Sequence, residues 1–252
     1  MSGHSKWHSI RHTKGKLDAD RGKLFTKLAR EIIVAAKAGG GSPDANITLR
    51  AAMQRAREAS MPQENIKRAI QRGTGEIEGA SYEDLTYEGY APGGVAVMVA
   101  CLTDNKQRTV ADVRAAFNKT GGRLAESGSV GYLFTPKGVL EVEPGAATED
   151  AVTEAAIEGG AEDVQATEDG GFEITTAPGD LDAVRLALEA AHIKIASSEQ
   201  TMIPQTSVSV TGKEAGQVLR LMDMLEDHDD VQKVYANFDI PEADLEAAES
   251  HR

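Results

Sequence analysis

The spacing of apolar residues changes once along this chain of 252 residues, and that change constrains the fold more than any other feature. Up to about residue 72, apolar side chains recur at intervals of three and four, the period of an amphipathic helix. From residue 95 onward, short runs rich in Val and Ile alternate with helical segments, which is typical of strands joined by helices. The chain therefore predicts a helical N-terminal part followed by an α/β part.

The N-terminal part contains three helical segments. The first covers residues 21–40, carries Leu24 on its inward stripe and ends in a run of glycines. The second is expected to begin at Ser42, with a proline in its first turn. The third follows Ser60 and Gln63, which have the spacing of a capping box. Together they predict one small bundle with a basic outer surface.

The α/β part contains one complete pattern between two half patterns. Residues 138–198 follow the order strand, helix, strand, strand, helix, strand. The segments at 95–134 and 206–239 each follow the order strand, helix, strand. We therefore predict an α+β fold: a basic three-helix N-terminal domain followed by two ferredoxin-like βαββαβ domains, the second inserted in the first. The expected limits are 1–78, 79–134 plus 203–240, 135–202 for the inserted domain, and 241–252 for an acidic tail.

Charge is divided unevenly between the two parts. The first 75 residues hold 15 Lys and Arg against 6 Asp and Glu, and the remainder holds 12 against 34. A basic block on an acidic body is the charge layout of a protein that touches nucleic acid with one end. Before Asp18 there is no acidic residue, and cations are interleaved with Trp7 and histidines. That mixture suits phosphate contact with base stacking, as unpaired RNA requires; the alternative is a solvated arm without fixed structure.

The candidate nucleic-acid-binding residues fall into two groups. Those of the N-terminal arm are Lys6, Trp7, His8, Arg11, His12, Lys14 and Lys16. Those on the outer faces of the second and third helices are Arg50, Arg57, Lys67 and Arg68. The second helix could present Arg50 and Arg57 to base edges in duplex DNA, and the same residues would equally suit ribosomal RNA.

Sequence motifs of catalysis are missing from the chain. It has no GxxxxGK[ST], GxGxxG after a strand, GxSxG, HExxH or CxxC. The single cysteine, Cys101, lies in the apolar run VAVMVACL and is expected to be buried, so no intramolecular disulfide forms and no thiolate nucleophile is available. Three histidines at i, i+4 spacing near the N-terminus would suit zinc, but glycines and cations around them oppose it. We predict no enzymatic activity, metal, cofactor or small-molecule substrate.

Three loops have alternative interpretations. The acidic run EDHDD at 226–230 is interpreted as a solvated turn rather than a metal site. In YEGYAPGGVA, Tyr87 and Tyr90 either cover a domain edge in a linker turn or stack on a base. In TDNKQRT, Asn105 caps a helix whose first turn contains Lys106 and Arg108, which oppose the helix dipole. Those two cations either meet an anionic partner or lie in water.

No apolar stretch approaches the 18 residues of a membrane span. We therefore expect a cytoplasmic protein without membrane contact, and a monomer.

Five separated motifs carry a resemblance to a known family. The opening GHSKWHSIRHTKGKLDADRGKLFTKLAREI, the stretch MPQENIKRAI, YEGYAPGGVAVMV, TDNKQRT and GSVGYLF resemble the YebC/PmpR family, whose members are described as probable transcriptional regulatory proteins and are related to a mitochondrial translational activator. The resemblance implies a helical domain followed by two α/β domains, one inserted into the other, and a cytoplasmic protein without an enzymatic reaction.

The same resemblance implies a nucleic-acid partner of one of two kinds. Family members are described as DNA-binding regulators, and also as ribosome-associated factors that assist translation of proline-rich stretches, where rRNA or tRNA would be the contact. The family's basic N-terminal motif extends beyond the arm onto Arg21, Lys23 and Lys27. We therefore expect a DNA-binding transcriptional regulator, with RNA binding on the ribosome as the alternative.

Overall fold

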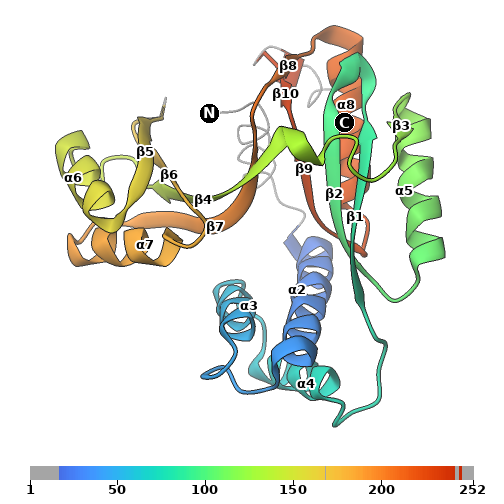
Figure 1. Cartoon of the computed structure of the whole chain (residues 1–252), viewed down its shortest axis with the longest axis horizontal. Helices are drawn as coiled ribbons and strands as arrows, with labels where there is room; N and C mark the ends of the chain where they lie inside the picture. Colours follow the sequence, from blue (N-terminus) through green and yellow to red (C-terminus); the bar gives the residue numbers. More distant parts are fainter. Residues whose placement is uncertain (1–16, 168, 242–243, 246–252) are drawn as a thin grey trace. The chain divides into compact units, whose positions relative to one another are not determined.

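The computed structural model describes residues 17–167, 169–241 and 244–245, with side chains from residue 21 onward (Figure 1). The arm candidates from Lys6 to Lys16 and most of the acidic tail lie outside the described residues. The chain divides into two compact units. One contains Tyr132–Ser207, and the other contains Gly3–Gly131 with Val208–Arg252. The fold is α+β, with N-terminal helices followed by β-α-β domains.

Three helices form the N-terminal domain, as the apolar spacing predicts. They are α2 (Leu17–Gly39), α3 (Ile47–Glu58) and α4 (Gln63–Thr74). Their shared apolar core includes Leu28, Ile32, Leu49 and Ile66. The prediction that Leu24 lies inward is wrong, since this side chain is 44% exposed.

The starts of the second and third helices differ from the prediction. Helix α3 begins after Asn46 rather than at Ser42, because Asn46 satisfies more backbone groups. Its Oδ1 accepts from Leu49 N at 3.0 Å, and its Nδ2 donates to carbonyl oxygens of the preceding chain at 2.8 and 2.9 Å. Helix α4 follows Pro62 with no side-chain cap, so the expected capping box does not form.

A four-stranded antiparallel sheet is the centre of the second domain. Its strands, in the order β3-β1-β2-β9, are β1 (Glu83–Tyr90), β2 (Ala96–Thr103), β3 (Arg123–Leu124) and β9 (Val231–Ala236). Helices α5 (Lys106–Thr120) and α8 (Gly212–Glu226) contribute Phe117 and Met222 to the buried core beside this sheet. Short connections complete the domain: η1 (Pro92–Gly94) and the parallel pair β8 (Val208–Ser209) and β10 (Phe238–Asp239). Cys101 is fully buried in that core, as expected, and burial raises the pKa of its thiol to about 12.

Strand β1 was not predicted, and it corrects the interpretation of the tyrosine loop. Tyr87 and Tyr90 belong to this strand, whose charged residues and Gly89 conceal its alternation in the sequence. Tyr87 pairs with Val99 and packs against the core. The hydroxyl of Tyr90 donates to the carbonyl of Ser129 at 2.9 Å. These rings are therefore part of a sheet rather than of a linker turn.

The last strand expected within the 95–134 segment, the stretch SVGYLF at 129–134, is also corrected. Gly131–Leu133 form a 3-10 turn, η2, and β4 begins only at Phe134. The backbone N–H groups of Gly128, Val130 and Gly131 donate to the buried carboxylate of Glu88 at 2.8, 2.6 and 2.9 Å. Because these donors are bound to a side chain, they are not available to a strand ladder.

The unit Tyr132–Ser207 has the complete βαββαβ order that the sequence predicts. Its elements are β4 (Phe134–Val142), α6 (Glu149–Gly159), β5 (Ala161–Ala166), β6 (Phe172–Thr176), α7 (Leu181–Ala190) and β7 (Ile195–Pro204). The sheet order β5-β6-β4-β7, with every neighbouring pair antiparallel, is that of a ferredoxin-like fold. Its core lies between this sheet and both helices.

Candidate nucleic-acid interface

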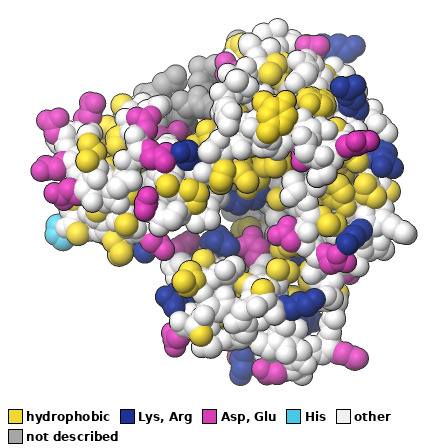
Figure 2. Space-filling view, viewed as in Figure 1, with side chains coloured by type: hydrophobic (Ala, Val, Ile, Leu, Met, Phe, Trp, Pro, Cys, Tyr) yellow, Lys and Arg dark blue, Asp and Glu magenta, His cyan; other side chains and the backbone are white. Residues whose placement is uncertain are grey.

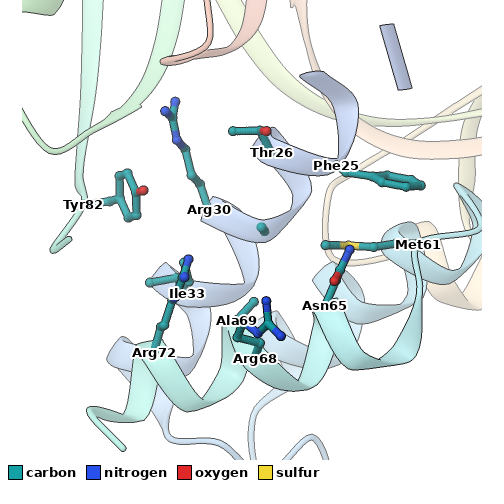
Figure 3. A pocket seen from close by; sticks show the side chains of 11 residues that line it. Phe25, Thr26, Arg30, Ile33, Met61, Asn65, Arg68, Ala69, Arg72 and Tyr82 are labelled. Atoms are coloured by element: carbon teal, nitrogen blue, oxygen red, sulfur yellow. The ribbon is translucent and has the colours of Figure 1, made fainter. Parts of the chain in front are cut away.

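A groove of about 270 Å³ lies between α2 and α4 of the helical domain (Figure 3). Its α2 side is one helical face, formed by Phe25, Thr26, Ala29, Arg30 and Ile33. Its α4 side is another, formed by Asn65, Arg68, Ala69 and Arg72, and Met61 and Tyr82 complete the lining. We call this site the α2–α4 groove. Apolar surface and three arginines therefore share one small concavity.

The arginines of α4 are available to an external anion. Arg68 and Arg72 are one turn apart and both exposed. Within the described part of the chain, neither forms an ion pair with an acidic side chain. A guanidinium presents a planar fork of donors that matches phosphate oxygens. The groove thus carries positive charge that the described residues leave uncompensated.

Two aromatic rings lie on opposite sides of the α2–α4 groove, Phe25 on one and Tyr82 on the other (Figure 3). Both rings are half-buried. The guanidinium of Arg21 lies 5.5 Å from the centroid of Phe25, and that of Arg30 lies 5.2 Å from the centroid of Tyr82. Such cation–π contacts hold the rings in place while leaving part of each surface open.

Arg30 joins the groove to a buried carboxylate. Its Nη1 lies 2.9 Å from Asp230 Oδ1, and only 2% of the Asp230 side chain is exposed. Asp230 also accepts from Arg108 Nη2 at 2.8 Å, from Thr109 Oγ1 at 2.7 Å and from Thr103 Oγ1 at 3.2 Å. Burial alone would raise the pKa of Asp230, but the bonds from Arg108 and Thr109 and the charge of Arg30 lower it. We call these residues the Asp230 cluster.

The Asp230 cluster corrects two interpretations of the sequence. The run 226–230 is not simply a solvated turn, because its last carboxylate is buried and shared by two arginines. Arg108 does not lie free in water, since it bonds to Asp104 and Asp230, and Lys106 pairs with Glu83. Asn105 caps α5 as expected, accepting from Arg108 N at 3.1 Å.

Two of the cations predicted to touch nucleic acid, Lys23 and Lys27, face the acidic turn 226–230. Lys27 Nζ donates to the carbonyl of Glu226 at 2.7 Å, and Lys23 lies 3.6 Å from a carboxylate oxygen of Asp227. Arg30 donates to the carbonyl of Asp229 as well. Residues 23, 27 and 30 share one face of α2. This face of α2 is therefore in contact with the acidic turn 226–230 of the same chain.

The remaining described candidates lie on three helices. Arg21 of α2 is exposed beside Phe25. On α3, Arg57 is exposed, whereas Arg50 bonds to the carbonyls of Pro43 and Asp44 at 3.0 Å each. Lys67 is exposed on α4, next to Arg68. Of the predicted residues that the structure describes, Arg68 alone lines the α2–α4 groove.

Sequence reasoning missed four residues that line the groove: Phe25, Arg30, Arg72 and Tyr82. Arg72 repeats Arg68 after one turn, and this spacing was a usable signal. Phe25 has the spacing of a core residue, and Tyr82 lies in the segment that joins α4 to β1. Nothing in the sequence places these two rings at one groove, because their proximity depends on the packing of α2 against α4.

Neither a three-residue metal cluster nor a membrane-spanning helix occurs among the described residues. No group of three His, Cys, Asp or Glu side chains there could hold a metal ion. Likewise, no helix within 17–167, 169–241 and 244–245 is long and apolar enough to cross a membrane.

The fold and the groove together define a class, an α+β protein with a basic helical domain and two β-α-β domains. Family models give the more particular identity. The model for the TACO1/YebC protein N-terminal domain matches residues 5–76, and the model for the TACO1/YebC second and third domain matches residues 82–238. The chain belongs to the TACO1/YebC family.

Relatives and a solved structure agree with this membership. A "Probable transcriptional regulatory protein" of Pelotomaculum thermopropionicum is 56% identical over 95% of this chain and 99% of its own length. One with the same name from Moorella thermoacetica is 56% identical over 96% of this chain and 97% of its own. The crystal structure of a conserved hypothetical protein, Aq1575, from Aquifex aeolicus is 50% identical, covers 91% of this chain and 94% of that one, and superposes with a TM-score of 0.81. These names support a regulatory role.

Proposed function

We propose that this chain is a non-enzymatic regulatory protein of the cytoplasm that binds nucleic acid through its helical domain. The observation that carries the proposal is the α2–α4 groove, where Arg68 and Arg72 are exposed with no acidic partner among the described residues. Clustered guanidinium groups on one helical face are the electrostatic footprint of a phosphate-binding surface. Lys67 and Arg57 extend the positive charge over the same domain.

The first candidate function is DNA-directed regulation of transcription. The names of the relatives favour it. Such a regulator must prefer its own site over random duplex by roughly 10³ or more, because competing genomic sites are so numerous. The contact surface would be α3 and α4, whose outward arginines are long enough to reach phosphates or base edges.

A second candidate is favoured by the rings of the α2–α4 groove. Phe25 and Tyr82 offer stacking surfaces that suit unpaired bases, and unpaired bases occur mainly in single-stranded segments and in RNA loops. A chain that works on ribosomal RNA or tRNA, including one that assists synthesis of proline-rich stretches, would use such a surface. It would need no preference for one duplex sequence.

Two measurements on the full chain separate these candidates. Genomic fragments enriched by the protein in cells are competed against random duplex, and cell lysate is fractionated on a sucrose gradient. The transcriptional function predicts a specificity ratio above about 10³ with the protein outside the ribosomal fractions. Weak, sequence-independent duplex binding with co-sedimentation would favour the second candidate. Binding to neither duplex nor ribosomes would contradict the proposal as a whole.

A further inference from the structure

We infer that the α2–α4 groove is the seat of one unpaired nucleotide of a single-stranded segment, with the base inside the groove and its phosphates on Arg68 and Arg72. This inference rests on the proposed nucleic-acid function and specifies the ligand. It excludes a duplex as the occupant.

Size is the first reason. The groove has a volume of about 270 Å³, just below the range of roughly 300–1,000 Å³ typical of sites for drug-sized ligands. One base with part of its sugar is of that size, whereas a base pair inside a duplex cannot enter a concavity between two packed helices. An occupant must therefore present a base that is already free of its stack.

The chemistry of the lining is the second reason. Ala29, Ile33 and Ala69 add apolar surface to the lining, and we call these three residues the apolar floor. Phe25 and Tyr82 lie on opposite sides of the groove (Figure 3). A base has an apolar, polarisable face that packs on such surfaces. An acidic peptide would suit the arginines but would leave the apolar floor and the rings without a partner.

An unsatisfied donor is the third reason. The Nε–H of Arg30 is buried and has no hydrogen-bond partner among the described residues. This guanidinium already has an anionic partner, because Nη1 binds Asp230, which Arg108 shares. A neutral acceptor therefore suits Nε better than a second anion, and a base carbonyl oxygen is such an acceptor. A buried donor that lacks a partner in the free protein and gains one on binding favours the complex.

Phosphate recognition completes the seat. Arg68 and Arg72 follow each other along the outer edge of α4 at the spacing of one helical turn. They are exposed, so their guanidinium groups reach the sugar-phosphate chain on either side of a base held in the groove. The arginines thus fix the backbone, and the groove accepts the base.

The test measures binding of the full chain to three labelled probes: oligouridylate, oligothymidylate, and a mixed-sequence DNA duplex of equal length. Arg68→Ala with Arg72→Ala is expected to weaken both single strands and to flatten the slope of log affinity against log salt by about 1.4 units. The matched control is Arg114→Ala with Lys119→Ala, which removes two exposed charges from α5 and is expected to leave slope and affinity unchanged. Equal affinity for the RNA and DNA strands would show that the groove recognises the base rather than the sugar. Tighter binding of the RNA strand would indicate an additional contact to the ribose.

Variants of the rings test the seat itself. Phe25→Leu and Tyr82→Leu keep apolar volume and remove the stacking surface, so each is expected to weaken single-strand binding roughly 5- to 100-fold while duplex binding stays unchanged. Because Tyr82 also contacts Arg30, thermal unfolding of each variant is measured in parallel. In a second readout that needs no variant, ultraviolet crosslinking of the wild-type chain to oligouridylate should give adducts on Phe25 or Tyr82.

Three outcomes overturn the inference while leaving the proposed function in place. They are duplex binding tighter than single-strand binding, full single-strand affinity in both ring variants, and adducts confined to residues outside the groove. A wild-type chain that binds none of the three probes would also overturn the inference, and the genomic-fragment competition and the sucrose gradient would then decide the proposed function separately.

Discussion

At the scale of single residues, Gly73 decides how closely α2 and α4 approach, and so the shape of the groove. A Cβ atom on Gly73 would lie 2.5 Å from the carbonyl oxygen of Ile33 and 2.7 Å from the Cβ of Ala36. Both distances are shorter than any normal contact, and the first neighbour is backbone that cannot turn aside. By contrast, a Cβ atom on Gly22, which lies on helix α2, would have no described atom of a neighbouring residue within 4 Å.

These two glycines give a matched pair of predictions. Gly73→Ala should destabilise the helical domain by about 1–3 kcal/mol, because the helices must separate. Gly22→Ala should stabilise it by up to about 1 kcal/mol, because alanine loses less backbone entropy in a helix. Urea unfolding with amide exchange of α4 measures both. Equal stabilisation by the two substitutions would show that α4 does not pack on α2 at this distance.

Glu88 is the second such residue, because its carboxylate holds the backbone of residues 128–131. Burial on its own raises the pKa of this carboxyl, but the N–H groups of Val130, Gly128 and Gly131 outweigh that effect and lower it below the ordinary value. A lowered folded-state pKa means that the stabilisation is present above the unfolded-state pKa and is lost as pH falls through the folded one.

Glu88→Gln should therefore cost about 1.5–3 kcal/mol of unfolding free energy at neutral pH, since it replaces charge-assisted hydrogen bonds by neutral ones. The difference from the wild type should shrink as pH falls below about 4.3, the ordinary pKa of Glu. Denaturant unfolding at several pH values measures it. A difference that stays constant down to the acid limit would contradict the role assigned to the carboxylate.

At the scale of elements, the contact of α2 with the acidic turn 226–230 connects the helical domain to α8 and β9. Asp230 is the centre of this contact, and removing its charge leaves Arg30 and Arg108 without their shared partner. A broken buried ion pair is costly because the other charge stays desolvated.

Asp230→Asn should accordingly lower the unfolding free energy by about 3 kcal/mol. It should also increase amide exchange at the C-terminal end of α8. The control is the exposed neighbour Asp229→Asn, whose side chain has no ion pair among the described residues. A double-mutant cycle with Arg30→Ala isolates the pair: a coupling near zero would mean that Arg30 and Asp230 do not stabilise the fold together.

Comparison of the predicted with the observed elements shows which parts of the fold the sequence alone predicts. The periods of apolar residues predicted all three N-terminal helices and the complete βαββαβ unit, because each of these buries one regular face. They missed β1, where Glu83, Asp84 and Glu88 interrupt the alternation and Gly89 weakens the signal for a strand. The local spacing of apolar residues shows which face of one helix or strand is buried. It does not show which elements pack against each other.

The candidate site was less predictable for the same reason. Arg68 was found because basic side chains on an outer face are visible in the sequence. The pairing of Lys23 and Lys27 with the turn 226–230 joins residues about 200 positions apart, and no local signal reports such a contact. Phe25 resembles a core residue until α4 and Tyr82 are placed beside it.

At the scale of the whole molecule, charge separates the two compact units. Residues 132–207 contain 3 Lys and Arg against 15 Asp and Glu, and acidic side chains are prominent on the face of α6 and β5 seen in Figure 2. A surface of that sign repels a polyanion over about a Debye length. Under the proposed function, the inserted unit is therefore not expected to take part in the contact with nucleic acid.

The inserted domain, predicted at 135–202, should fold by itself, and we propose for it the limits 132–207 of the compact unit. Its first and last strands pair directly, Phe134 with Pro204, so entry and exit of the chain lie side by side. Residues 132–207 expressed alone, and the remaining chain closed by a short glycine linker, should each unfold cooperatively by circular dichroism. An inserted unit that stays unfolded under native conditions would contradict the nested arrangement.

The most direct test of the account is to sequence the nucleic acid crosslinked in growing cells to the wild-type chain and to two charge-reversal variants. Arg68→Glu with Arg72→Glu reverses the groove, and Arg114→Glu with Lys119→Glu reverses the same number of exposed charges on α5. We predict that the groove variant recovers nucleic acid only at background level, while the α5 variant recovers the same fragments as the wild type. Undiminished recovery with the groove variant would contradict the claim that the helical domain binds nucleic acid through the α2–α4 groove.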